Sequence, residues 1–203
     1  MEMVNSAAIK EDVKYKPGNK NNRLIDTICS TKCFELLNTF LFKSAEGMYQ
    51  SEIVKKSGLS PNTAIPLLRE LTHQGILHEE VVAGTIFYHI EEDNPIVRHL
   101  RILTNLTNIY EATKEVGNDV QIYVFGSAAR GEDTENSHID ILMLANGSSD
   151  DLEELKSRLK QDISKKLDRD VNLVAYTPAQ YSALYYEKKL LFESIENEKI
   201  KVL

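Results

Sequence analysis

The sequence predicts an α+β protein made of two small parts that a long helix joins. Three observations lead to this expectation. Residues 23–93 carry short helical patterns followed by one two-strand pattern, residues 94–117 carry apolar side chains at helical spacing, and residues 118–203 alternate apolar runs with helical patterns. A chain of 203 residues is long enough for two such parts, each with its own core.

Composition predicts an ordinary globular protein of the cytoplasm. Hydrophobic residues make up 42% of the chain and charged residues 27%, and the formal net charge is -7. No apolar run approaches the roughly 20 residues that a membrane helix needs, and the N-terminus lacks the apolar core of a signal peptide. We therefore expect no membrane partner.

The first third of the chain holds both cysteines and a lysine-bearing start. Cys29 and Cys33 lie four positions apart in a predicted helix, where they are expected to pack as small apolar residues rather than to bridge or bind metal. Residues 1–22 place four lysines among asparagine, glycine and proline with little apolar periodicity. This composition predicts a flexible, solvated arm.

Residues 23–93 begin with helical patterns. Phe34, Leu37 and Leu41 recur at helical spacing, and a short second helix is expected over 52–57, where a glycine follows.

A third helix and a hairpin complete this part. Ser60 and Pro61 supply an N-cap and a first-turn proline for a helix that is expected to end at Gly75. The β-prone runs 76–82 and 85–90 then predict two strands about a tight turn.

A long amphipathic helix is expected over 94–117. Its apolar seam consists of residues that recur at spacings of four and three: Ile96, Leu100, Leu103, Thr107 and Tyr110. Two interpretations of the seam stay open. It packs on the two parts of its own chain, or it forms a two-fold dimer.

The most informative stretch begins in the second half of the chain. Val124-Phe125-Gly126-Ser127-Ala128-Ala129-Arg130-Gly131 predicts a strand, a Gly-Ser turn and a short helical turn, and Ser137-His138-Ile139-Asp140-Ile141-Leu142 predicts a second strand. Gly126 lets the backbone approach a phosphate closely, the Ser127 hydroxyl can donate to it, and Arg130 adds positive charge. His138 and Asp140 are two apart, so on a strand they share a face and could hold a metal.

These residues resemble the signature of the DNA polymerase beta superfamily, specifically its minimal nucleotidyltransferases. In that family Gly-Ser is followed by Asp-apolar-Asp, and both aspartates ligate the Mg2+ that binds the triphosphate. Here His138 stands in the first aspartate position, and Asp140 in the second. The third carboxylate of the family is best matched by Asn172, with Asp170 two residues earlier on the same face.

The substitutions decide how much activity the resemblance implies. Magnesium prefers oxygen ligands, whereas imidazole is better suited to zinc, nickel or copper. Losing carboxylates also removes negative charge from a site that concentrates cations on a polyphosphate. We therefore expect ordinary transfer with Mg2+ to be strongly impaired. Two interpretations of the pocket stay open: it binds ATP or another nucleoside triphosphate, or it is simply inherited.

Residues 23–93 resemble a winged helix-turn-helix domain. The full fold class that the two resemblances imply is α+β, with a winged helix-turn-helix domain joined by a long helix to a nucleotidyltransferase-like, mixed-sheet α/β domain. The resemblance implies DNA contacts by a set of residues in the third helix and the wing: Ser60, Asn62, Thr63, Arg69 and Gly84.

Between Ser60 and Ile90 the sole Lys or Arg is Arg69, against Glu79 and Glu80 nearby, so the electrostatic attraction for DNA is weak. Pro66 inside the third helix costs about 3 kcal/mol unless the helix kinks. A dimerisation or protein-docking module is the competing interpretation.

The remaining pattern fits an alternating domain. A helix is expected from Ser149, a strand over 171–175, a tyrosine-rich helix from Pro178 and a short edge strand over 200–203. The tyrosines of that helix are expected to serve packing rather than base stacking.

Together the two resemblances point to small prokaryotic, often archaeal, proteins described as predicted transcriptional regulators or nucleotidyltransferases. The leading hypothesis is a homodimeric DNA-binding regulator whose nucleotidyltransferase-fold domain has a degenerate catalytic site and senses a nucleotide. The alternative is an active enzyme that transfers NMP from NTP to a protein or nucleic-acid acceptor, with the winged helix as docking module. A non-catalytic assembly module is the third hypothesis.

Overall fold

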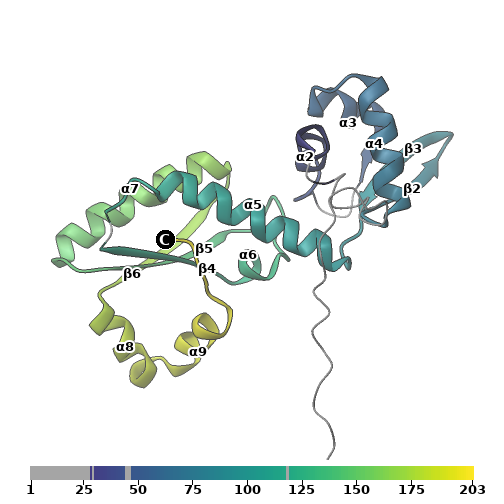
Figure 1. Cartoon of the computed structure of the whole chain (residues 1–203). Helices are drawn as coiled ribbons and strands as arrows, with labels where there is room; N and C mark the ends of the chain where they lie inside the picture. The colour runs from purple at the N-terminus through teal and green to yellow at the C-terminus, as the bar shows by residue number, and fades with distance from the viewer. Residues whose placement is uncertain (1–27, 29, 44–46, 118) are drawn as a thin grey trace, which may run out of the picture.

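The computed structural model describes residues 28, 30–43, 47–117 and 119–203. The predicted arm at 1–22 and Cys29 lie outside these residues. Figure 1 shows two bodies joined by helix α5 (Pro95–Thr113). We call the body before α5 the N-terminal unit and the body after it the C-terminal domain.

The N-terminal unit has three helices and a small antiparallel sheet. Along the chain they are α2 (Thr31–Asn38), β1 (Met48–Tyr49), α3 (Gln50–Ser57), α4 (Pro61–His73), β2 (Leu77–Val82) and β3 (Thr85–Ile90). The strands lie in the order β1-β3-β2. The short helix, the third helix and the hairpin that the sequence predicts are therefore confirmed as elements.

Local chemistry explains these elements. The hairpin turn has positive φ at both Ala83 and Gly84, the geometry that matches the twist of two paired strands. Pro66 stays inside α4, where it lies on the exposed side, so its ring faces solvent rather than the core. The core beneath contains buried apolar side chains from every element: Leu36, Leu37, Met48, Ile53, Leu68, Leu71, Leu77 and Tyr88.

The C-terminal domain is a four-stranded mixed sheet with helices on both faces. Its elements are β4 (Val120–Phe125), α6 (Ser127–Arg130), β5 (Ile139–Ala145), α7 (Ser149–Leu167), β6 (Val171–Tyr176), α8 (Pro178–Glu187), α9 (Lys189–Glu198) and β7 (Ile200–Lys201). The order is β6-β5-β4-β7; β5 and β6 are parallel and the other pairs are antiparallel. The predicted strands and the short edge are confirmed, whereas the expected tyrosine-rich helix is followed by a second helix, α9.

Alternation along the strands separates the two faces of this sheet. Ile139 and Ile141 of β5 pack with α5 and α7, whereas Leu142 and Leu144 pack with α8 and α9. Figure 1 shows the same layering, with α5 and α7 on one side and α8 and α9 on the other. Asp140 lies two residues before Leu142, so it is on the α8–α9 face.

Helix α5 belongs to both cores. Leu100 packs in the core of the N-terminal unit and Ile109 in the core of the C-terminal domain. Of the seam residues predicted for this helix, Leu100 is buried, whereas Ile96, Leu103 and Tyr110 are exposed by 37%, 52% and 46%. The interpretation in which the seam packs on its own chain is therefore mostly wrong, and the dimer interpretation stays a prediction. The buried face shifts around the helix between its two neighbours, which a single straight stripe does not represent.

A buried arginine fastens α5 to the N-terminal unit. Arg101 Nε donates to the carbonyl oxygen of Leu41 at 2.7 Å, and its terminal nitrogens bind both oxygens of Glu92 at 2.6 and 2.9 Å. A two-pronged pair of this kind is directional, so it fixes how the helix leaves the unit. Within the part of the chain that the structure describes, no helix is long and apolar enough to span a bilayer.

Candidate functional site

A glycine turn brings the backbone after β4 against an aspartate of β5. Gly126 has a φ of 68° and a ψ of -150°, a conformation that favours glycine strongly. A Cβ built on Gly126 would lie 2.7 Å from Oδ2 of Asp140. Both the backbone angles and the nearby carboxylate therefore require glycine here.

An amide holds the other oxygen of the same carboxylate. The parallel register of β5 and β6 places Asp140 beside Asn172. Asn172 Nδ2 donates a hydrogen bond of 2.9 Å to Oδ1 of Asp140. The structure thus brings together Gly126, Asp140 and Asn172, an arrangement that we call the Asp140 site.

His138 makes no hydrogen bond to the residues of the Asp140 site. The sequence places it on the second strand, but β5 begins at Ile139, so this placement is corrected by one residue. Its side chain is 69% exposed, and its Nδ1 lies 4.0 Å from Oδ2 of Asp170, beyond hydrogen-bond reach. Asp170 likewise precedes β6 rather than lying on it.

No group of three or more histidine, cysteine, aspartate or glutamate side chains in the described ranges is arranged to hold a metal ion. The expected metal pair, His138 and Asp140, stays a prediction. Its donor set is one carboxylate and one imidazole, which suits a nitrogen-tolerant ion better than Mg2+.

The two predicted phosphate-binding side chains differ in their surroundings. The Ser127 hydroxyl makes no hydrogen bond within the described chain, whereas Arg130 Nε binds Glu132 at 2.7 Å and Arg130 Nη1 binds Glu198 at 2.6 Å. The hydrogen bond to Glu132, reinforced by the charge of Glu198, raises the pKa of Arg130. The same hydrogen bond lowers the pKa of Glu132. The carboxylates of Glu132 and Glu198 are therefore paired with the guanidinium that a bound phosphate would need.

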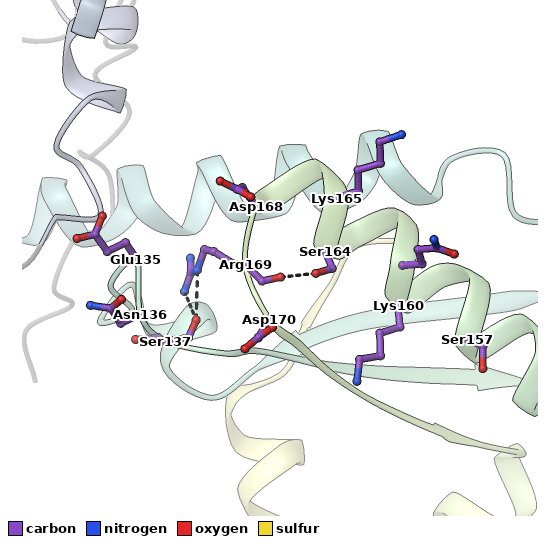
Figure 2. Close-up of a pocket in the computed structure, with 11 residues that line it drawn as sticks. Glu135, Asn136, Ser137, Ser157, Lys160, Ser164, Lys165, Asp168, Arg169 and Asp170 are labelled. Carbon is purple, nitrogen blue, oxygen red and sulfur yellow. Dashed lines mark hydrogen bonds between the residues drawn. The ribbon is translucent and has the colours of Figure 1, made fainter.

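Figure 2 shows a polar groove between the end of α7, the loop at 135–137 and the turn at 168–170. Its volume is about 840 Å³, and the three residues of the Asp140 site do not line it. A smaller hollow of about 540 Å³ shares Lys160, Ser164 and Asp170 with this groove and continues to His138 and Asn172. Through this hollow the groove reaches Asn172, one of the three residues of the Asp140 site.

The predicted DNA-contacting residues lie mostly at the surface of the N-terminal unit. Ser60, Asn62, Arg69 and Gly84 are exposed, and Thr63 is half-buried with its hydroxyl 3.1 Å from that of Ser60. They come from the start and outer side of α4 and from the hairpin turn.

Sequence reasoning missed the polar residues that support the site. Glu198 pairs with Arg130 across 68 positions, and Asp133 binds Arg169 across 36 positions. Two charged residues, Arg169 and Asp170, precede the apolar strand at 171–176, and they were the available signal for Arg169. Nothing local indicated its partner.

Residues 106–202 match the family model of the nucleotidyltransferase domain. The C-terminal part of the chain is therefore a nucleotidyltransferase-fold domain. No curated protein gives a significant match.

Two solved structures are similar to part of the chain. A toxin–antitoxin complex with AMP-PNP is 26% identical, with 49% of this chain and 73% of that chain covered and a TM-score of 0.37. The toxin–antitoxin MntA-HepT is 24% identical, with 50% of this chain and 71% of that chain covered and a TM-score of 0.34. At these TM-scores neither likeness carries an argument about function.

Proposed function

We propose that the C-terminal domain binds a nucleoside triphosphate at the Asp140 site and performs little transfer with Mg2+. The observation that carries the proposal is the Asp140 carboxylate held between Gly126 and the amide of Asn172. The turn provides the close backbone approach that phosphates need. One carboxylate among three family positions supplies too little negative charge for two magnesium ions.

Ser127 and Arg130 are the proposed phosphate-binding side chains. The Ser127 hydroxyl is free to donate within the described chain, and Arg130 changes partners from Glu132 and Glu198 to the phosphate oxygens. Such binding uses hydrogen bonds and charge rather than a metal, so it survives the substitutions at His138 and Asn172.

Calorimetry with ATP, GTP and CTP, with and without Mg2+, tests the proposal. We expect binding that depends weakly on Mg2+ and that the double variant Ser127→Ala/Arg130→Ala reduces at least about tenfold, because each charge-assisted bond is worth roughly 1.5–3 kcal/mol. The matched control is Ser182→Ala/Arg158→Ala, two exposed positions on α8 and α7 outside the groove and the Asp140 site. Unchanged affinity in the first variant would contradict the proposal.

Active transfer of NMP is the second candidate. The observation that favours it is the half-buried Asp140, whose hydrogen-bond partner Asn172 lines a hollow of about 540 Å³ together with His138. Robust transfer with Mg2+ by the unmodified protein, abolished by Asp140→Ala, would put this candidate first.

For the N-terminal unit we propose a winged helix-turn-helix that contacts DNA weakly. The helix order, the sheet order β1-β3-β2 and the exposed outer side of α4 support this assignment. Arg69 is the main cation of α4, while the wing exposes Glu79 and Glu80, so binding needs two copies of the unit.

Replacing Arg69 tests the DNA contact. Arg69→Ala is expected to weaken binding about equally for all sequences and to reduce the salt slope by about one charge. Lys56→Ala on the neighbouring helix α3, where Lys56 pairs with Glu52, is the control. A salt slope that Arg69→Ala leaves unchanged would show that α4 is not the contact surface.

We propose further that the chain forms a homodimer along the exposed stripe of α5. Ile96 and Tyr110 each lie seven positions from Leu103. In an antiparallel pair of helices that cross at Leu103, Ile96 of one copy therefore faces Tyr110 of the other copy. The stripe is flanked by Asp93 at one end and Lys114 at the other. Antiparallel packing brings Asp93 of one copy close to Lys114 of the other, whereas parallel packing places each charge beside the same charge of the second copy.

A further inference from the structure

Arg169 lies in the turn between α7 and β6 and holds the loop that precedes β5. Its side chain is only 7% exposed, and its Nη1 binds Oδ2 of the fully buried Asp133 at 2.7 Å. Its Nε and Nη2 both donate to the backbone carbonyl oxygen of Ser137, at 3.3 and 3.0 Å (Figure 2). One guanidinium thus fixes the loop at two points.

The two segments that Arg169 ties together carry the Asp140 site. Ser137 directly precedes His138, and Arg169 is three residues before Asn172. The amide of Ile139 also donates to the carbonyl oxygen of Asp170 at 2.9 Å, which aligns the starts of β5 and β6. A shift of the guanidinium therefore changes how Asn172 meets Asp140.

The fourth contact of Arg169 comes from the other body of the molecule. The ring of Phe42, which follows α2, faces the guanidinium with 5.4 Å between Cζ and the ring centroid. The carbonyl oxygen of Phe42 accepts a hydrogen bond of 2.8 Å from the amide of Glu135, and Lys43 forms an ion pair with the Glu135 carboxylate. The N-terminal unit thus touches both Arg169 and the loop that Arg169 holds.

We propose that Arg169 is a positioning residue through which the N-terminal unit sets the geometry of the Asp140 site, with Phe42 as its contact. The proposal rests on nucleotide binding at that site. A ligand of the N-terminal unit that moves Phe42 changes nucleotide affinity, and a bound nucleotide changes the affinity for that ligand by the same factor.

Two conservative variants separate positioning from simple support of the fold. Phe42→Leu keeps an apolar side chain but removes the ring face, and Arg169→Lys keeps the charge but loses the fork that reaches Ser137 and Asp133. Phe87→Leu is the matched control, because Phe87 is an aromatic residue of the same unit whose ring contacts that of Tyr49 instead.

NMR of the full chain without nucleotide gives the first measurement. Phe42→Leu and Arg169→Lys are expected to shift the ring signals of His138 and the side-chain amide signals of Asn172, and Phe87→Leu is expected to leave both in place. Unshifted signals in both test variants would overturn the proposal. This result does not depend on nucleotide binding.

Calorimetry with ATP gives the second measurement. Phe42→Leu is expected to weaken binding about 2- to 5-fold, the factor that corresponds to loss of one cation–π contact, while Phe87→Leu leaves the affinity at the wild-type value. Equal affinities of all three proteins would overturn the coupling. If the wild type binds no ATP, the proposed function fails, and the NMR shifts alone decide the positioning role.

Discussion

At the scale of single residues, the Asp140 site differs from a magnesium-dependent centre by its charge. Asp140 is the sole carboxylate among three matched positions, and the amide of Asn172 occupies one of its oxygens. A neutral donor in place of a carboxylate lowers the attraction for a divalent ion and leaves no group at Asn172 to act as a base. Restoring one carboxylate should therefore restore part of the cation affinity.

His138→Asp tests this reasoning. The added carboxylate beside Asp140 is expected to raise Mg2+ affinity about tenfold, roughly 1.4 kcal/mol, in a calorimetric titration with MgCl2. Transfer returns at most in part, because Asn172 still replaces the third carboxylate. His73→Asp on the exposed side of α4 adds the same charge far from the site and serves as control. Equal Mg2+ affinity in both variants would refute the metal interpretation of position 138.

Cys33 offers a second residue-scale prediction, on stability. Burial raises the pKa of the Cys33 thiol from 9.0 to about 11. Between these values the unfolded chain releases a proton that the folded chain retains, so rising pH favours unfolding. A shift of this size corresponds to about 2–3 kcal/mol of stability, present below pH 9 and lost as the pH rises to about 11.

Urea unfolding of wild type and Cys33→Ala at pH 8.5 and 10.5 measures this loss. The variant is expected to be less stable at pH 8.5, because it leaves a small cavity, but to lose less stability on the way to pH 10.5. The buried Tyr88 and Tyr181 also have raised pKa values, and their contributions cancel in the comparison. Identical pH slopes would mean that the thiol ionises equally in both states.

At the scale of elements, a carboxylate at the end of α9 is paired with the arginine at the end of α6. Glu198, the last residue of α9, pairs with Arg130, the last residue of α6. The end of α9 is itself fixed, since Glu196 accepts hydrogen bonds from Tyr181 and Lys199. Burial acts to raise the pKa of Glu196, but these two hydrogen bonds outweigh it and lower the pKa. An anion bound at Arg130 therefore competes with a firmly placed carboxylate.

Glu198→Gln removes that competitor. ATP affinity is expected to rise about 2- to 5-fold, because a surface ion pair is worth roughly 0.2–1 kcal/mol. The control is Glu193→Gln, five residues earlier on α9, which pairs with Lys189 rather than with Arg130. Calorimetry with ATP compares the two variants, and a Glu198→Gln affinity that does not exceed the control would mean that Arg130 takes no part in phosphate binding.

Some elements could be predicted from the sequence and others could not. Helix α4, the hairpin and strands β4 to β6 follow from local signals: an N-terminal proline, a two-residue turn and apolar runs. The face of α5 that packs on its own chain did not, because its buried residues contact two cores that lie at different angles around the helix. Glu198, which pairs with Arg130, and Asp133, which pairs with Arg169, lie 68 and 36 positions away from them, and no local pattern specifies such partners.

At the scale of the whole molecule, α5 is the element on which both bodies depend. Leu100 and Arg101 anchor it in the N-terminal unit, and Ile109 anchors it in the C-terminal domain. Gly131 reinforces this arrangement, because a Cβ there would lie 2.2 Å from the carbonyl oxygen of Arg98. One side of α5 makes these contacts, and its outer stripe is the surface on which we propose that a second copy packs.

Leu103→Glu tests that dimer. A charge at the proposed crossing point would face its own copy across the two-fold axis, so sedimentation at tens of micromolar is expected to change from dimer to monomer. The substitution is on an exposed position, so the fold should persist. Leu190→Glu on α9, where Leu190 is 85% exposed, is the matched control and should leave the dimer intact.

The charges at the ends of the stripe decide its direction. Asp93→Lys alone is expected to weaken the dimer by placing like charges together, and Asp93→Lys/Lys114→Asp is expected to restore it, because the exchange recreates the opposite pair in antiparallel packing. In parallel packing each position meets its own copy, so the double variant would gain nothing over the single one. A wild-type chain that sediments as a monomer, or a double variant as weak as Asp93→Lys, would rule out the antiparallel α5 dimer.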